Sequence, residues 1–182
     1  MIDTMHIGSF EVLSGKMQVT DPCYNRGTWC QGVLENVMNG KWVASVEIVP
    51  NSMTGWGDRI GKIIVKNNDG VPKNYHTLEA EIGVDSGQAG FFCDSGYPQE
   101  HTGEYDDEET FYAFYGKICE LTMTEQKSGV LSFGAVSSSG FGDGGYVCNY
   151  WTDSDGTVIQ AEIVFITDED FEDDSTDDEF DL

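Results

Sequence analysis

Short runs in which apolar and polar residues alternate dominate the first part of the chain. In the run KWVASVEIV, the apolar Trp42, Val46 and Ile48 alternate with polar residues on the opposite face. A period of two residues is typical of half-buried β-strands. We therefore predict four antiparallel strands, at 6–12, 16–20, 41–49 and 61–66.

One segment departs from this period. After the acidic residues that end at Glu109, the run TFYAFYGKICELTM has the spacing of an amphipathic helix. Asp107 is the predicted N-cap, and the neighbouring acids favour the positive end of the helix dipole. We predict one main helix near 107–122, packed on a sheet, whose apolar face consists of Phe111, Phe114, Tyr115, Ile118, Cys119 and either Leu121 or Thr122.

The pattern after the helix predicts further strands. Residues 129–137 form one predicted strand, and YVCNYW, TDSDG and TVIQAEIVFI predict a hairpin with Gly156 in a left-handed turn. Alternate residues of its second strand supply core: Ile159, Ala161, Ile163 and Phe165. The predicted fold is mainly β with a minor α part, a single antiparallel sandwich-like or bent-sheet domain over 1–166. Residues 167–182 are predicted to form a flexible acidic tail.

Charge is distributed unevenly. The chain has 9 Lys and Arg against 33 Asp and Glu, a formal net charge of -24. Seven basic and seven acidic residues balance over 1–74, whereas two basic and 26 acidic residues follow from 75 onward. Such a balance excludes a protein that holds nucleic acid or an anionic membrane by a broad basic face.

Two acidic clusters are the predicted partner-binding residues. The first consists of Glu100, Glu104, Asp106, Asp107, Glu108 and Glu109, and the second of Asp168, Glu169, Asp170, Glu172, Asp173, Asp174, Asp177, Asp178, Glu179 and Asp181. Phe171, Phe180 and Leu182 lie between the acids of the second cluster and can anchor it in a pocket while its carboxylates meet Arg or Lys. The simpler interpretation is that such a tail only maintains solubility.

Other chemistry has weaker sequence support. No apolar run is long enough for a membrane span, and the first residues do not resemble a signal peptide. We expect no metal and no cofactor, because the histidines have no metal-binding spacing and the cysteines form no CxxC pair. The histidines are His6, His76 and His101, and the cysteines, expected to be free thiols, are Cys23, Cys30, Cys93, Cys119 and Cys148.

A ligand or catalytic site among the glycine-rich loops remains an alternative. Its polar groups would be Asp21, Asp85, Ser86 and Asp143, although such residues more often cap turns. The loop at 137–146 lacks the lysine of a phosphate-binding loop, and DSDG lacks the further ligands of a calcium loop. The rings of Trp29, Trp42 and Trp56 are expected in the core, with a second, apolar partner contact as the alternative.

Three blocks resemble an uncharacterised family of small proteins from bacterial, mobile-element and phage genomes, largely of Firmicutes. They are SGKMQVTDPCY at 14–24 with TWC at 28–30, GVDSGQAGFF at 83–92, and VSSSGFGDGGY at 136–146. The resemblance covers most of 7–166 and brings no established catalytic residues. The length, the acidic end and this phage-like setting also resemble an anti-CRISPR protein that acts on the RNA-guided nuclease of type II-A systems.

The expected function is therefore an inhibitor, not an enzyme, that binds a type II CRISPR nuclease and blocks its DNA binding or cleavage. A net charge of -24 matches the phosphates of duplex DNA over on the order of 40 Å, so carboxylates can occupy the nuclease's DNA-binding cations. The expected partner is that nuclease, with or without guide RNA, in the cytoplasm of a bacterial host, with no direct nucleic-acid or membrane contact. The alternatives are the loop site above and an acidic sequestering partner of another basic protein.

Overall fold

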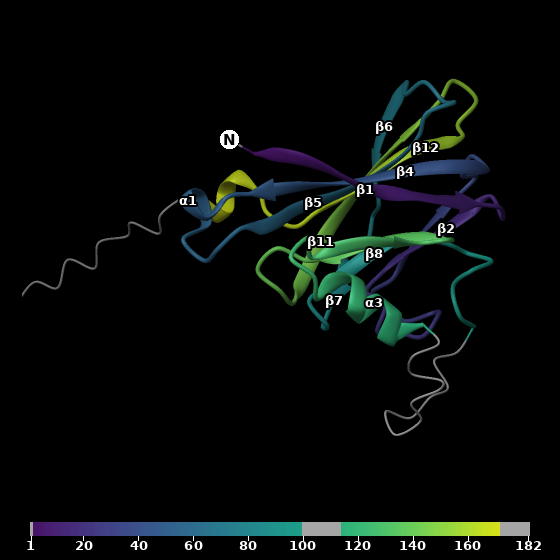
Figure 1. Cartoon of the computed structure of the whole chain (residues 1–182). Helices are drawn as coiled ribbons and strands as arrows, with labels where there is room; N and C mark the ends of the chain where they lie inside the picture. The colour runs from purple at the N-terminus through teal and green to yellow at the C-terminus, as the bar shows by residue number, and fades with distance from the viewer. Residues whose placement is uncertain (1, 100–113, 172–182) are drawn as a thin grey trace, which may run out of the picture.

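Two packed antiparallel sheets form the body of the molecule (Figure 1). The computed structural model describes residues 2–99 and 114–171. Within them one sheet has seven strands, with the order β1 (Asp3–Val12), β4 (Gly40–Val49), β5 (Arg59–Asn67), β12 (Val158–Val164), β11 (Gly144–Thr152) and β6 (Asn74–Thr77), and β7 (Ile82–Val84) also pairs with β11. The other has five strands, with the order β3 (Gly32–Glu35), β2 (Lys16–Thr20), β8 (Gln88–Cys93), β10 (Gly134–Ser138) and β9 (Ser128–Leu131).

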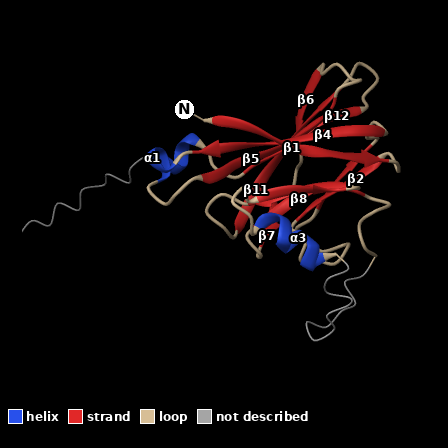
Figure 2. Ribbon diagram, viewed as in Figure 1, coloured by secondary structure: helices blue, strands red, loops and turns tan. Residues whose placement is uncertain are grey.

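Little of the described chain is helical (Figure 2). A short α1 (Asn51–Thr54) connects β4 to β5, α3 (Tyr115–Thr122) covers the outer face of the five-stranded sheet, and the 3-10 helix η1 (Asp168–Phe171) follows β12. The predicted β-dominated class with one main helix is confirmed.

The main core lies between the two sheets. Trp42, Val46 and Ile63 of the seven-stranded sheet are fully buried with Met17 and Phe91 of the five-stranded sheet. The indole N–H of Trp42 donates to Met38 O at 2.8 Å, so its one polar atom is satisfied. Each such side chain contributes about 2–3 kcal/mol by leaving water. The prediction of a core position is thus confirmed for Trp42 but is wrong for the exposed Trp29 and Trp56.

A second core lies under α3. Phe114 and Ile118 are buried against Phe92, Tyr97 and Val136 on the outer face of the five-stranded sheet. The described helix begins at Tyr115, so the predicted helix is wrong at Phe114, which has the non-helical angles φ -135 and ψ -70. Aromatic packing against Phe92 and Tyr97 holds the Phe114 ring in place outside the helix. The predicted N-cap Asp107 lies outside the described residues.

The four strands predicted before residue 67 are present, and one detail differs. A β-bulge between Glu47 and Ile48 in the β4–β5 pair advances the alternation by one residue, so that Val49 is buried and Ile48 is only half-buried. Ile48 still packs against the main core, so its predicted place on the apolar face is confirmed in part.

The predicted single strand at 129–137 is instead the β9–β10 hairpin. Gly134 pairs with Leu131, and the turn between them consists of Ser132 and Phe133. The chain turns at this point because the Phe133 ring packs against Phe92 and Phe114, so that residue 133 does not continue the strand.

The β11–β12 hairpin forms as predicted. Asp153 Oδ1 accepts the N–H groups of Asp155 and Thr157, each at 2.9 Å, and Gly156 has φ 81. The turn is therefore built by side-chain capping, and Ile159, Ala161, Ile163 and Phe165 of the following segment are buried.

Folded structure continues past the predicted end at 166. Thr167 donates its N–H and its hydroxyl to Asp170 Oδ2, at 2.7 and 3.0 Å, and Phe171 packs on the main core. The prediction that the tail is flexible from residue 167 is thus wrong for η1, and residues 172–182 lie outside the described part.

Gly90 lies where β8 and β10 approach closely. A Cβ at this position would stand 2.1 Å from Ala135 O, and no side-chain rotation relieves a contact with backbone. We predict that Gly90→Ala lowers the free energy of unfolding by about 1–3 kcal/mol, measured by urea denaturation. Gly144→Ala is the matched control, because its nearest contact would be Tyr146 OH at 3.4 Å. An equal loss in both variants would contradict this packing.

Candidate functional site

The three blocks singled out in the sequence contain neighbouring strands of the five-stranded sheet. Strand β8 pairs with β2 on one side and with β10 on the other. Beyond the strand ends, Ser139 N–H donates to Gly87 O at 3.0 Å, which joins the third block to the second. Hydrogen bonds of Asp21 join the first block to the second at the same place.

The carboxylate of Asp21 is fully buried at this junction. Its Oδ2 accepts the N–H groups of Asp85 and Ser86, at 2.9 and 2.7 Å. Its Oδ1 accepts the N–H of Cys23 at 2.8 Å and the hydroxyl of Ser86 at 2.6 Å. Four donors therefore surround one carboxylate, which ties two loops together.

The thiol of Cys23 and the carboxylate of Asp85 belong to the same junction. Burial is the main cause of a raised pKa of the Cys23 thiol, and the nearby charge of Asp21 is the second. The thiol therefore stays protonated at neutral pH. Tyr24 OH donates to Asp85 Oδ2 and so occupies that carboxylate. Asp143 is exposed, and the hydrogen bonds of the described residues do not link it to the other three. The structure thus brings together Asp21, Asp85 and Ser86 but not Asp143.

Of the predicted acidic clusters, the structure describes Asp168, Glu169 and Asp170. All three are exposed on η1. The remaining predicted residues lie outside the described part of the chain: Glu100, Glu104, Asp106, Asp107, Glu108, Glu109, Glu172, Asp173, Asp174, Asp177, Asp178, Glu179 and Asp181.

A cavity of about 550 Å³ opens beside η1 on the seven-stranded sheet. Two tyrosines, Tyr75 and Tyr146, and three acids, Glu81, Glu169 and Asp170, contribute to its lining. The phenol of Tyr146 donates to Gly142 O at 2.6 Å, and its ring meets Phe165 edge-on at 5.1 Å. The Tyr146 ring is therefore fixed, and the carboxylates lie around an aromatic wall.

Sequence reasoning missed Glu81 and Tyr146. They come together because β7 pairs with the start of β11, placing Ile82 opposite Tyr146. The Glu81 carboxylate lies over Gly145, where a Cβ would meet Oε2 at 2.5 Å. A contact between residues so distant in sequence depends on strand pairing, and no local motif indicates it.

Most described carboxylates have no cation beside them. Of the 33 acidic residues, thirteen fall in 100–113 and 172–182, leaving twenty in the described part beside all nine basic residues. Only four of these twenty form ion pairs there, namely Glu35, Glu47, Asp94 and Glu162. Twenty acidic residues against nine basic ones give the described part a formal charge of -11, so its surface field is negative.

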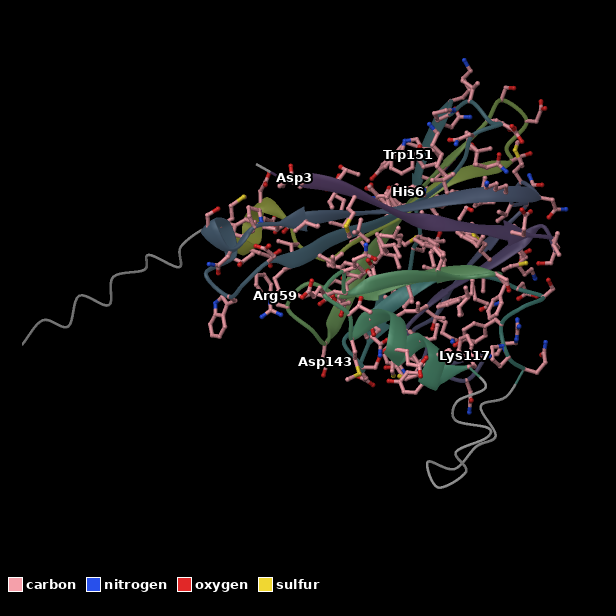
Figure 3. The ribbon with its side chains drawn as sticks, viewed as in Figure 1. Asp3, His6, Arg59, Lys117, Asp143 and Trp151 are labelled. Atoms are coloured by element: carbon pink, nitrogen blue, oxygen red, sulfur yellow. The ribbon has the colours of Figure 1, made fainter. Side chains whose placement is uncertain are left out.

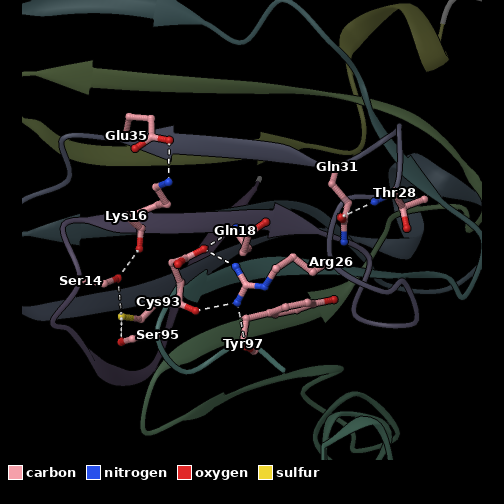
Figure 4. A network of polar contacts seen from close by, with 11 residues as sticks. Ser14, Lys16, Gln18, Arg26, Thr28, Gln31, Glu35, Cys93, Ser95 and Tyr97 are labelled. Atoms are coloured by element: carbon pink, nitrogen blue, oxygen red, sulfur yellow. Dashed lines mark hydrogen bonds and ion pairs between the residues drawn. The ribbon is translucent and has the colours of Figure 1, made fainter. Parts of the chain in front are cut away.

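A separate polar network lies on the five-stranded sheet (Figure 4). The guanidinium of Arg26 forms an ion pair with Asp94, donates to Tyr97 O at 2.8 Å and stacks over the Tyr97 ring. Burial opposes ionisation of Asp94, but hydrogen bonds from Gln18 and Arg26 outweigh it and lower the pKa of that carboxyl. A cavity of about 410 Å³ adjoins the network, yet the cations on its wall are paired, Arg26 with Asp94 and Lys16 with Glu35.

The buried Cys93 forms part of the same region. Burial alone raises the pKa of this thiol, but the N–H of Leu13 and the hydroxyls of Ser14 and Ser95 point at the sulfur. These hydrogen bonds together lower the pKa of Cys93 to about 7.

The two described histidines, His6 and His76, lie in different surroundings. His6 Nδ1 lies 3.0 Å from Ala44 O, and His76 stacks on Tyr150 at 4.9 Å, whereas His101 lies outside the described residues. Over residues 2–99 and 114–171, no group of three or more His, Cys, Asp or Glu has metal-binding geometry. None of the helices in these ranges has the length and apolar character required to cross a bilayer.

Replacing Asp21 by Asn tests its role as a loop clamp. Whichever carboxylate oxygen is replaced by the amide NH2 group, at least one backbone N–H then faces a donor instead of an acceptor. We predict that Asp21→Asn lowers the free energy of unfolding by about 2–3 kcal/mol in urea denaturation. The control is Asp143→Asn at an exposed loop position, expected to change it by less than about 0.5 kcal/mol. Unchanged stability of Asp21→Asn would show that the clamp is unimportant.

The lowered pKa of Cys93 predicts a pH dependence of stability. The thiol titrates near 7 when folded and near its ordinary value of 9.0 when unfolded, so stability rises between these pH values and is lost below 7. The rise is about 2–3 kcal/mol and is absent in Cys93→Ala, measured by urea denaturation at several pH values. Cys148→Ala should retain it, because burial raises the pKa of that thiol. A rise that persists in Cys93→Ala would assign it to another group.

Comparison with known proteins finds no match: no family model, curated protein or solved structure is similar to this chain.

Proposed function

We propose that this protein is a binding protein that antagonises a nucleic-acid-binding enzyme by offering carboxylates to its cations. The partner we favour is the RNA-guided nuclease of a type II CRISPR system in the host of a phage or mobile element. Binding would block the entry or cleavage of DNA, because the same arginines and lysines that hold phosphates would hold this surface.

The observation that carries the proposal is the cavity beside η1. An arginine side chain that enters it meets the faces or edges of Tyr75 and Tyr146 and the carboxylates of Glu81 and Glu169. Carboxylates bind a guanidinium through paired hydrogen bonds, and aromatic rings attract its charge. Tyrosines and acids around one concavity therefore favour cationic side chains over anionic or neutral ones.

Charge over a wider area supports the same conclusion. Sixteen of the twenty described carboxylates lack an ion pair within the described residues, and fourteen of these sixteen are exposed, so they can attract a basic partner from a distance. The acidic residues at 172–181 follow η1 directly in sequence and add seven more carboxylates.

An enzyme with a site at Asp21, Asp85 and Ser86 has less support. All the hydrogen bonds of the Asp21 carboxylate hold backbone and Ser86 in place, which is the arrangement of a structural clamp. A sequestering protein for another basic partner would use the same surface as the antagonist, and the identity of the bound partner separates the two.

A charge-matched pair of triple variants tests the proposal. Glu81→Gln and Glu169→Gln remove acids that line the cavity, and Asp168→Asn removes the exposed acid next to Glu169 on η1. Glu11→Gln, Asp69→Asn and Asp155→Asn instead remove exposed acids at the opposite end of the sheet. We predict that the first triple weakens binding to a type II-A nuclease about tenfold in low salt and relieves inhibition of DNA cleavage. The readouts are titration calorimetry and a cleavage assay at two salt concentrations.

The control triple carries the same net charge, so long-range attraction falls equally in both. Equal affinity of the two triple variants would show that the cavity is not part of the interface. Absence of binding by the wild-type protein at low salt would exclude this nuclease as the partner, and tight binding without loss of cleavage would support sequestration instead.

A further inference from the structure

A loop between α1 and β5, held by hydrogen bonds of its own side chains, presents an exposed tryptophan. Trp56 is 76% exposed and the nearby Met53 is 42% exposed. Side chains fix the loop from within, because Asn51 Oδ1 accepts the N–H of Gly57 at 2.7 Å and Thr54 Oγ1 accepts that of Trp56 at 3.1 Å. Asp58 Oδ1 accepts the N–H of Asn51 at 2.8 Å and closes the loop.

The conformation of the loop is determined by its backbone and not by contacts of the Trp56 indole. Gly55 and Gly57, on either side of Trp56, have φ 68 and φ 86, conformations that place the intervening residue at the tip. The hydrogen bonds involve the backbone of Trp56, while its side chain remains in solvent. A large apolar ring held at a preorganised tip is typical of a binding anchor, since its exposure contributes nothing to the fold.

The loop lies at the same end of the seven-stranded sheet as η1 (Figure 1). The N–H groups of Phe165 and Ile166 both donate to Gly61 O, which ties the start of β5 to the chain just before η1. Trp56 precedes Gly61 by five residues, and η1 begins two residues after Ile166. The aromatic tip and the first residues of the acidic run therefore share one end of the molecule.

Acidic groups outnumber basic ones at this end. Asp3, Asp58, Asp168, Glu169 and Asp170 are exposed there, and Figure 3 shows Asp3 and Arg59 on this side of the molecule. The basic groups are Arg59, which is half-buried, and Lys127, whose ammonium donates to Asp58 O. A cavity of about 180 Å³ lies between them, with Met5, Ile48 and Ile60 in its lining.

We propose that the Trp56 loop is the docking anchor for an arginine-bearing protein segment, with the indole stacking on a guanidinium while the carboxylates of η1 bind neighbouring cations. The proposal deepens the proposed function and rests on it. A planar guanidinium stacks on an indole face more effectively than an ammonium does, so arginine is favoured over lysine at this position. The surrounding carboxylates exclude anionic partners such as nucleic acid.

The other exposed tryptophan provides an internal control. Trp29 is 90% exposed on the loop that follows β2, next to the region where Arg26 and Lys16 are already paired with acids. The acids of that region are already paired with basic side chains. Trp29 should therefore not attract a cationic peptide, although its exposure is comparable to that of Trp56.

The test is an NMR titration of the ¹⁵N-labelled full chain with a nona-arginine peptide in low salt. The side-chain N–H signals of Trp29 and Trp56 are assigned by their loss in Trp29→Ala and Trp56→Ala. We expect the Trp56 signal and the backbone amides of Asp168, Glu169 and Asp170 to shift, and the Trp29 signal to stay. Trp56→Ala should bind the peptide about two- to fivefold more weakly, Trp56→Phe should restore part of the loss, and Trp29→Ala should bind like the wild type.

The outcomes distinguish the two proposals. Shifts of the η1 amides with an unmoved Trp56 signal and unchanged affinity of Trp56→Ala would overturn the anchor while leaving cation binding intact. Absence of any shift would overturn the proposed function itself. Equal affinity for nona-arginine and nona-lysine, with equal effects of Trp56→Ala on both, would show that the indole does not select arginine. Both alanine variants should keep the wild-type thermal unfolding, because both side chains are exposed.

Discussion

The buried carboxylate of Asp21 is the contact on which the arrangement of the loops depends. A buried carboxyl group is tolerated only when hydrogen-bond partners replace its water, and here three backbone N–H groups and one hydroxyl do so. The same bonds fix the turn after β2 against the turn between β7 and β8. Because β8 is central in the five-stranded sheet, this contact also sets the position of the strands on either side of it.

Asp21 has a structural role, because its carboxylate holds two loops together. Few of the other acids have such a role. Asp153 and Asp170 cap turns, and Asp94 holds Arg26, but most described carboxylates lie in solvent without an ion pair within the described residues. Mutual repulsion among them lowers the stability of the compact state. A net charge of -24 is thus a property that the fold tolerates rather than one that it needs, which is consistent with a role in recognition.

Alternation along the chain was sufficient to predict β1, β2, β4, β5 and the β11–β12 hairpin, because these elements have one buried face. It did not predict β3, β6, β7 or the fully buried β8. It was insufficient where tertiary packing decided the outcome. The bulge at Ile48, the turn at Phe133 and the non-helical Phe114 each depend on rings or strands far away in sequence. For the candidate site, the sequence identified the acids at 168–170 but placed them in a flexible tail rather than on η1. It did not indicate the approach of Glu81 to Tyr146, which depends on strand pairing.

The exposed tryptophans show most clearly how a plausible expectation fails. Large rings usually occupy cores, and Trp42 does, yet Trp56 lies exposed at the tip of a loop whose backbone is held by hydrogen bonds to Asn51 and Thr54. Charge and an aromatic anchor complement each other in recognition. Carboxylates act over distance and accelerate association with any basic surface, so they discriminate poorly among partners. An indole acts only on contact and requires a group of fitting shape, so it supplies the selectivity and the slow dissociation that a diffuse negative field lacks.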